Sequence, residues 1–181
     1  MTSSELRPVR RIVTGDDAEG RSRIVEDGPS PAVMLVSGMV GFRNTNVWAT
    51  HGSPTPIDAP DRIVEHQGVL PPRQGTVVRI IDIPPEIVDP AERKRQTDAV
   101  FKQMFRDAGH VADSPRHTGM HKTDTIDYAI LLEGELTAIM DQGETIMRAG
   151  DILIQRGTNH AWANRSGKPC RIAFILIDAK R

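Results

Sequence analysis

Several kinds of residue are scarce in this sequence, and each scarcity excludes a class of protein. Cys170 is the only cysteine in 181 residues, so no disulfide can form within the chain. No apolar run approaches the roughly 20 residues needed to span a bilayer. The N-terminal "MTSSELRPVRRIV" lacks the apolar segment of a secretory signal. We therefore expect a cytoplasmic protein without a membrane partner, in which Cys170 is a buried, reduced thiol.

The numbers of charged and aromatic residues limit the kinds of partner and substrate that the protein can bind. The 23 lysines and arginines nearly balance the 24 aspartates and glutamates, so bulk charge attracts neither nucleic acid nor an anionic membrane. Aromatic residues make up only 4% of the chain, with two Trp, one Tyr and four Phe. Because so few side chains can stack, we expect a small organic substrate rather than a long sugar chain or a nucleic acid.

The arrangement of turn residues divides the chain into three parts. A length of 181 residues with 38% hydrophobic residues suits one globular domain. Residues 1–88 are expected to form N-terminal strands and an arm, residues 89–109 a helix, and residues 115–178 a core of closely spaced antiparallel strands. The expected N-terminal strands are Arg11–Thr14, Ser22–Val25, Val33–Val36, Asn46–Thr50 and the segment "GTVVRIIDI".

The helix has clear start and stop signals. Asp89 can cap its first turn, Pro90 suits the first helical position, and Glu92 follows three residues after the cap. Gly109 can end the helix in the left-handed conformation. An apolar stripe at helical spacing favours packing against a sheet over a partner-binding or lid role. The stripe consists of Val100, Phe101, Met104, Phe105 and Ala108.

The stretch "HTGMHKTDTIDYAILLEG" carries the residues with the most chemistry. If residues 117–129 form one unbroken strand, alternation places five side chains on one face. These are His117, His121, Thr123, Thr125 and Asp127. His117 is four residues from His121, so it can join that residue at a common site only through a turn or bulge near Gly119.

A further histidine, His160, begins a later strand, "HAWAN". Two histidines and one carboxylate around open positions are an arrangement that binds non-haem iron, and zinc accepts the same ligand types. His121, Asp127 and His160 are therefore candidate metal ligands, with His117 as a possible fourth. The plain alternative is that the histidines line a barrel and that Asp127 pairs with Arg156 or a threonine.

Other residues of these strands are candidates for a substrate pocket. Trp162 shares a face with His160 by alternation and would supply an aromatic wall, although packing on the outer face explains it equally well. Thr123 and Thr125 would add hydroxyls to the pocket, whereas ordinary β-propensity also accounts for them. We also assign Arg156, in the segment "QRG", to the substrate pocket.

Two motifs in residues 115–178 resemble those of the cupin superfamily, whose first motif runs G-x5-H-x-H-x3/4-E-x6-G and whose second runs G-x5-P-x-G-x2-H-x3-N. The matching positions are His121, Thr123, Asp127 and Gly134 for the first motif and Gly150, Gly157, His160 and Asn164 for the second. The departures concern the metal ligands. Thr123 replaces a histidine, Asp127 replaces a glutamate, and Gln155 stands where proline is usual.

This resemblance implies an all-β fold, an antiparallel double-stranded β-helix or jelly-roll barrel with one helix before the core. It also implies a homodimer and a small-molecule enzyme with one divalent metal ion, such as Fe, Zn, Mn or Ni, in the barrel. Dioxygenases, decarboxylases, dehydratases and isomerases all occur in the family. Two alternatives stay open, a non-catalytic metabolite-binding protein and a metal-free enzyme that uses Asp127 and His160 as acid and base.

Overall fold

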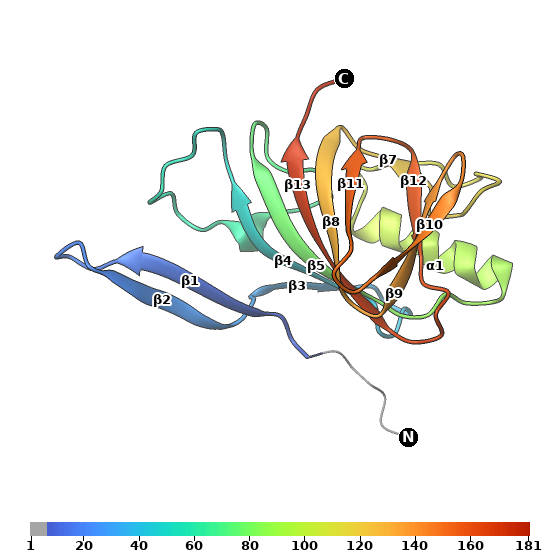
Figure 1. Cartoon of the computed structure of the whole chain (residues 1–181), viewed down its shortest axis with the longest axis horizontal. Helices are drawn as coiled ribbons and strands as arrows, with labels where there is room; N and C mark the ends of the chain where they lie inside the picture. Colours follow the sequence, from blue (N-terminus) through green and yellow to red (C-terminus); the bar gives the residue numbers. More distant parts are fainter. Residues whose placement is uncertain (1–6) are drawn as a thin grey trace.

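Two antiparallel sheets face each other and form the barrel that the sequence predicts (Figure 1). The computed structural model describes residues 7–181, so residues 1–6 of the predicted N-terminal part lie outside the described residues. The larger sheet has the order β11 (Ile152–Arg156), β8 (Thr125–Glu133), β13 (Cys170–Asp178), β5 (Thr76–Ile83), β4 (Arg43–Thr50) and β3 (Ala32–Leu35). The smaller sheet has the order β10 (Glu144–Arg148), β9 (Glu135–Met140), β12 (His160–Ala163), β7 (His121–Lys122) and β6 (Gly109–His110).

Alternation along the strands builds the core between the two sheets. On β8, Ala129 and Leu131 are fully buried, whereas their neighbours Tyr128 and Leu132 are about two-fifths exposed. Side chains from the smaller sheet, such as Leu136 and Met147, join the same apolar cluster. Each sheet therefore turns one face inward, as the alternating pattern predicts.

The predicted single strand over residues 117–129 is wrong. Residues 117–120 form a turn, β7 covers only His121–Lys122, and β8 begins at Thr125. The break has a topological cause, because β7 pairs with β12 in the smaller sheet whereas β8 pairs with β11 and β13 in the larger one. The chain crosses from one sheet to the other at Thr123–Asp124, and one straight strand cannot belong to both.

Helix α1 (Pro90–Gln103) begins as predicted and ends earlier than predicted. The Asp89 side chain accepts a hydrogen bond of 2.7 Å from the backbone N–H of Glu92, and Pro90 occupies the first turn. Gly109 does not end the helix, since it belongs to β6 and pairs with Lys122. A Cβ atom at residue 109 would lie 2.9 Å from the Lys122 carbonyl oxygen, so glycine is needed there for close strand approach.

The N-terminal strands also form, and two of them lie apart from the barrel. β1 (Arg10–Asp16) and β2 (Ser22–Pro29) pair only with each other and extend as a hairpin (Figure 1). Arg11 anchors this hairpin, since its guanidinium bonds to Glu26, to Asp61 and to the Val47 carbonyl and lies over the Trp48 ring. A short 3-10 turn, η1 (Ile63–Glu65), follows β4.

The structure bears on two expectations from composition, the state of Cys170 and the presence of a membrane-spanning helix. Cys170 is buried and unpaired, and its burial raises the pKa of the thiol to about 12, which is consistent with an unreactive side chain. Within residues 7–181, no helix combines the length and the apolar composition needed to cross a membrane.

Candidate functional site

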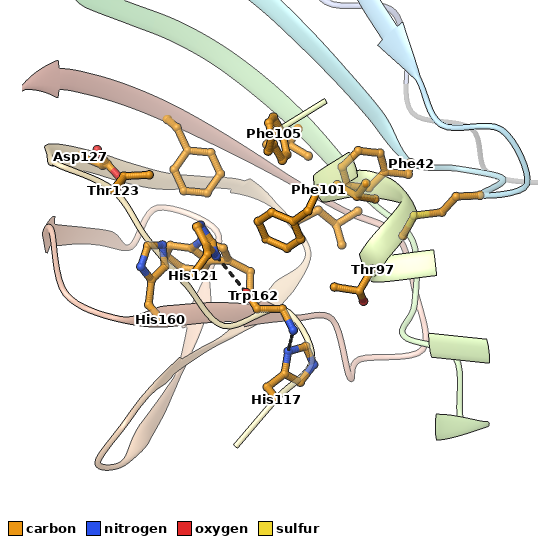
Figure 2. A pocket seen from close by; sticks show the side chains of 16 residues that line it. Phe42, Thr97, Phe101, Phe105, His117, His121, Thr123, Asp127, His160 and Trp162 are labelled. Atoms are coloured by element: carbon orange, nitrogen blue, oxygen red, sulfur yellow. Dashed lines mark hydrogen bonds between the residues drawn. The ribbon is translucent and has the colours of Figure 1, made fainter. Parts of the chain in front are cut away.

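A cavity of about 150 Å³ lies between the two sheets and α1 (Figure 2). Its walls are mostly aromatic and aliphatic, because α1 supplies Phe101 and the strands supply inward-facing residues. An apolar cavity of about this volume can accommodate one benzene-sized ring. The aromatic lining residues are Phe42, Phe101, Phe105, Trp162 and Phe174, and the polar ones include His117, His121, Thr123, Asp127 and His160.

Strand pairing brings two of the predicted histidines together. His121 on β7 and His160 on β12 are direct partners in the register, and their ring centroids lie 4.2 Å apart at an angle of 48°. Each ring is oriented from behind by a carbonyl oxygen two residues earlier. His121 Nδ1 lies 2.9 Å from the Gly119 oxygen, and His160 Nδ1 lies 2.9 Å from the Thr158 oxygen.

These contacts fix the tautomer of both rings. A carbonyl oxygen can only accept, so each Nδ1 carries a proton and donates it, and each neutral ring has an unprotonated Nε2. Burial lowers the pKa of His121 to about 3, with help from His160, and lowers the pKa of His160 to about 4. At neutral pH the pair therefore offers two nitrogen lone pairs, and neither Nε2 has a hydrogen-bond partner within residues 7–181.

Asp127 brings a carboxylate to the same cavity from the opposite sheet. Its side chain is 4% exposed, and its Oδ1 atom is buried without a hydrogen-bond partner. Burial raises the pKa of this carboxyl to about 6, although the Thr125 hydroxyl and the Arg79 guanidinium act in the opposite direction. Asp127 is thus an ionised but poorly solvated acceptor at neutral pH.

The predicted set of metal ligands is not assembled as a group. Among residues 7–181, no three His, Cys, Asp or Glu side chains lie close enough together to hold a metal ion. The reason is topological, since His121 and His160 belong to the smaller sheet and Asp127 belongs to the larger one. Only the two imidazoles meet the requirements of ligands, because each has a free Nε2 and an Nδ1–H fixed by a carbonyl.

His117 reaches the cavity, as the predicted turn near Gly119 allows, but both of its nitrogens are engaged. The backbone N–H of Gly119 donates to His117 Nδ1 at 3.0 Å, so Nε2 carries the proton and donates to Glu86 Oε1 at 2.5 Å. His117 is therefore oriented as a hydrogen-bonding residue rather than as a metal ligand. The same Gly119 peptide contacts His121 through its oxygen, which links the two histidines.

The predicted pocket residues are divided between the inside and the outside of the barrel. Trp162 lines the cavity edge-on to His160, with ring centroids 5.5 Å apart, and Thr123 lines it beside Asp127 (Figure 2). Thr125 lies behind the cavity and pairs its hydroxyl with that of Thr123 at 2.8 Å. Arg156 does not line the cavity, because Gln155 takes the inward position on β11 and leaves Arg156 exposed at a separate surface hollow.

Several lining residues were not expected from the sequence. Phe101 of α1 stacks on His110 with ring centroids 3.9 Å apart and lies 5.1 Å from the ring of His121. Its place in the apolar stripe predicted burial, and only the crossing of α1 over the barrel brings it to the histidines. Glu86, which orients His117, lies just after β5, and its local sequence gives no sign of this contact.

Comparisons with known proteins identify the family of the chain. Residues 107–177 match the cupin domain family. The chain is 31% identical to phomopsin biosynthesis cluster protein C' of Diaporthe leptostromiformis, over 98% of the chain and 82% of that protein. It is 26% identical to the cupin-domain-containing oxidoreductase virC of Hypocrea virens, over 97% of the chain and 78% of that protein. A solved cupin 2 conserved barrel domain protein from Salinispora arenicola aligns with a TM-score of 0.41 at 13% identity, covering 80% of the chain and 82% of that structure.

Proposed function

The chain belongs to the cupin superfamily, and from this membership we propose that it is an enzyme acting on a small, largely apolar organic molecule that carries a hydroxyl group. The proposal rests on one observation about three acceptor atoms in the cavity. His121 Nε2, His160 Nε2 and Asp127 Oδ1 are acceptor atoms without protein partners, and they line one aromatic cavity. Buried acceptors need donors, and a hydroxyl group on an apolar ring would supply one.

The aromatic wall determines which molecule fits. Phe101 and Trp162 present ring faces and edges to a space of about 150 Å³, which suits a single flat ring. A substrate hydroxyl placed between the imidazoles and Asp127 would donate its one hydrogen bond to Asp127 Oδ1, the buried acceptor without a partner. The apolar remainder of the molecule would then lie against α1.

The chemistry that this arrangement supports is proton transfer. Asp127 would remove the hydroxyl proton, since its carboxylate is ionised above about pH 6 and held in an apolar setting. The protonated Asp127 would return that proton to a neighbouring unsaturated carbon, converting an enol or phenol into its keto tautomer. No atom or electron is lost, and Phe101 and Trp162 hold the substrate ring in place during the transfer.

The relatives support a role in making small organic molecules. Three of them carry the names of biosynthesis clusters, and others are named cupin-domain-containing oxidoreductases. We propose that this chain likewise acts on an intermediate of small-molecule biosynthesis. A metabolite-binding protein without catalysis is the rival, and the effect of Asp127→Asn on turnover distinguishes the two.

A second candidate has its own observation, the pair of prepared imidazoles. His121 and His160 would hold a divalent metal ion through their Nε2 atoms, and within residues 7–181 no third His, Cys, Asp or Glu side chain lies close enough to join them. Such an ion would supply Lewis-acid activation of an oxygen atom or of bound water. Phe101 and Trp162 would keep the role given above, which is to orient the substrate and to exclude water.

Ligand binding tests the favoured proposal without any need for turnover. Trp48→Phe leaves Trp162 as the single tryptophan, so its fluorescence reports on the cavity. Phenol and toluene are matched in size, and only phenol donates a hydrogen bond. We expect Asp127→Ala to weaken phenol binding about tenfold, the equivalent of one hydrogen bond, and to leave toluene binding within about twofold.

The control for this experiment is Arg156→Ala, which lies outside the cavity and should change neither affinity. An equal loss of phenol and toluene binding in Asp127→Ala would contradict the proposed role of this acceptor.

Metal analysis tests the second candidate. After reconstitution with Fe²⁺, Zn²⁺, Mn²⁺ or Ni²⁺ and removal of free ion, the metal version predicts about one ion per chain in the wild type and a loss of most of it in His160→Ala. His117→Asn serves as the control and should keep its metal, because His117 is committed to Glu86 and Gly119. A wild type that retains no metal after reconstitution argues against this version.

A further inference from the structure

The two imidazoles keep unused acceptor atoms after a hydroxyl group has bound to Asp127. A hydroxyl carries one proton, and in the proposed function that proton goes to Asp127 Oδ1. His121 Nε2 and His160 Nε2 then remain lone pairs that no hydrogen-bond donor within residues 7–181 fills. Both side chains line the cavity, and His160 is only 2% exposed. An unfilled acceptor at such a depth is unfavourable, so we expect the ligand to bring further donors.

The backbone holds these two lone pairs close together and in one orientation. His121 and His160 are paired residues of β7 and β12, and their ring centroids lie 4.2 Å apart. Each Nδ1 donates to a carbonyl oxygen two residues earlier at 2.9 Å. Neither ring can turn its N–H into the cavity without losing that bond. The pair therefore offers the ligand two acceptors and no donor.

A single group with two donors matches this pair of acceptors. The two N–H bonds of an amino group diverge, and with hydrogen bonds of about 3 Å they reach acceptors roughly 5 Å apart. Two imidazoles with centroids 4.2 Å apart present their nitrogens on this scale. A hydroxyl group would serve one imidazole and leave the other unfilled, and a carbonyl or ether oxygen would serve neither.

Asp127 meets a different group of the same ligand. It lies on β8 of the larger sheet, whereas both imidazoles lie on the smaller sheet across the cavity (Figure 2). No three His, Cys, Asp or Glu side chains of residues 7–181 approach closely enough to surround one ion, so the ligand reaches the two walls with separate groups. Phe101 and Trp162 line the same space of about 150 Å³, which suits a flat ring between those groups.

We propose that the ligand is an aromatic ring with a hydroxyl group at one end and an uncharged amino group at the opposite end. The hydroxyl group donates to Asp127, and the amino group donates to His121 and His160. The two groups lie at opposite ends of the ring because neighbouring substituents would point to the same wall. An amino group on an aromatic ring is neutral at pH 7, so it enters an apolar cavity without the burial of a charge. The inference rests on the proposed function, since Asp127 is taken as the acceptor of the hydroxyl proton.

Four ligands of similar size test the two ends of the site separately. They are p-xylene with no donor, p-cresol with the hydroxyl group alone, p-toluidine with the amino group alone, and p-aminophenol with both. Titration calorimetry at pH 7 in the presence of EDTA keeps metal ions off the imidazoles. In the wild type, p-toluidine should bind at least about tenfold tighter than p-xylene, and p-aminophenol at least about tenfold tighter than p-cresol.

Removal of one imidazole should affect only the ligands that carry an amino group. His160→Ala should weaken the binding of p-toluidine and p-aminophenol about tenfold and leave p-cresol and p-xylene within about twofold. The p-xylene measurement corrects for the change in cavity size. His51→Asn alters an exposed histidine and is the control, which should keep the affinities of the wild type. Nitrogen NMR of the wild type needs no variant, since p-toluidine should shift the Nε2 resonances of two histidines and p-xylene should not.

The results distinguish this inference from the proposed function. Binding of p-toluidine no tighter than that of p-xylene in the wild type would overturn the inference, and a p-cresol affinity above that of p-xylene would then leave the role of Asp127 intact. Binding of p-cresol no tighter than that of p-xylene would contradict the proposed function and, with it, the ligand with two groups. An equal loss of all four ligands in His160→Ala would also overturn the inference, because it would indicate a structural role for that ring.

Discussion

Asp127→Asn is expected to lower turnover about 100- to 10,000-fold, the range by which a positioned general base accelerates a reaction. The reason lies in the site, where Asp127 is the one carboxylate among residues 7–181 that lines the cavity, and asparagine cannot accept a proton there. Resorcinol in D₂O gives a direct assay, because removal of its hydroxyl proton and deuteration of the ring carbon exchange a ring hydrogen that NMR detects. The wild type should accelerate this exchange, and its rate should rise as the pH rises through about 6, where Asp127 ionises.

The stability of the same variant separates catalysis from folding. Burial without a full set of hydrogen bonds disfavours the ionised form of Asp127, so at pH 7 the neutral asparagine should be at least as stable as the wild type. An inactive variant that also unfolds readily would indicate a structural role instead. A wild type that fails to accelerate exchange would favour the non-catalytic, metabolite-binding alternative.

Acid is expected to destabilise the protein steeply between pH 6.5 and pH 4. His121 and His160 have folded pKa values of about 3 and about 4, below the ordinary value of 6.5, so each contributes stability that is present above pH 6.5 and lost as the pH falls toward the folded value. Asp127 acts in the opposite sense, since its pKa is raised from 3.8 to about 6 and its protonation on acidification favours the folded state.

The histidines outweigh the carboxylate, because there are two of them and each is displaced further from its ordinary pKa. At 1.36 kcal/mol per pKa unit, these three groups together lower the unfolding free energy by about 4 kcal/mol between pH 7 and pH 4, a large part of the 5–15 kcal/mol typical of a folded domain. Urea unfolding followed at pH 7, 5 and 4 measures this loss directly.

The double variant His121→Asn/His160→Asn tests the cause of the acid sensitivity. An asparagine amide can donate to the Gly119 and Thr158 oxygens as Nδ1–H does, but it takes up no proton in this range. We expect the double variant to lose much less stability than the wild type between pH 7 and pH 4, with His66, whose pKa burial lowers to about 4, still contributing. His51→Asn, at an exposed position, should behave like the wild type. If the double variant were as acid-sensitive as the wild type, the buried histidines would not be the cause.

Much of the secondary structure could be predicted from the sequence, because it depends on interactions between residues that are close together in the chain. The cap at Asp89, the short N-terminal strands and the alternation along β8 depend on neighbouring residues, and the structure contains all three. The end of the helix did not follow from local signals. Glycine is typical of the position just after a helix, which is why Gly109 predicted the end of the helix. In the structure, the close approach of the Lys122 backbone is what requires a glycine there.

In the candidate site, too, some side-chain positions could be predicted from the sequence and others could not. The motif positions of His121 and His160 predicted their meeting, and the register of β7 with β12 brings them together. The role of His117 depends on its hydrogen bond to Glu86, 31 residues earlier in the chain. The position of Arg156 outside the cavity depends on which face of β11 turns inward. Side chains that depend on distant partners cannot be placed by spacing along one strand.

By itself, the sequence determined that residues 115–178 form closely spaced antiparallel strands, because alternation and turn chemistry act over a few residues, and the likeness of two motifs to those of the cupins implied the barrel. Only the tertiary structure decided that the histidines and Asp127 face each other from opposite sheets and that α1 closes the cavity with Phe101. The physical reason is that these relations depend on how the two sheets and the helix pack, and packing joins residues that have no relation along the chain.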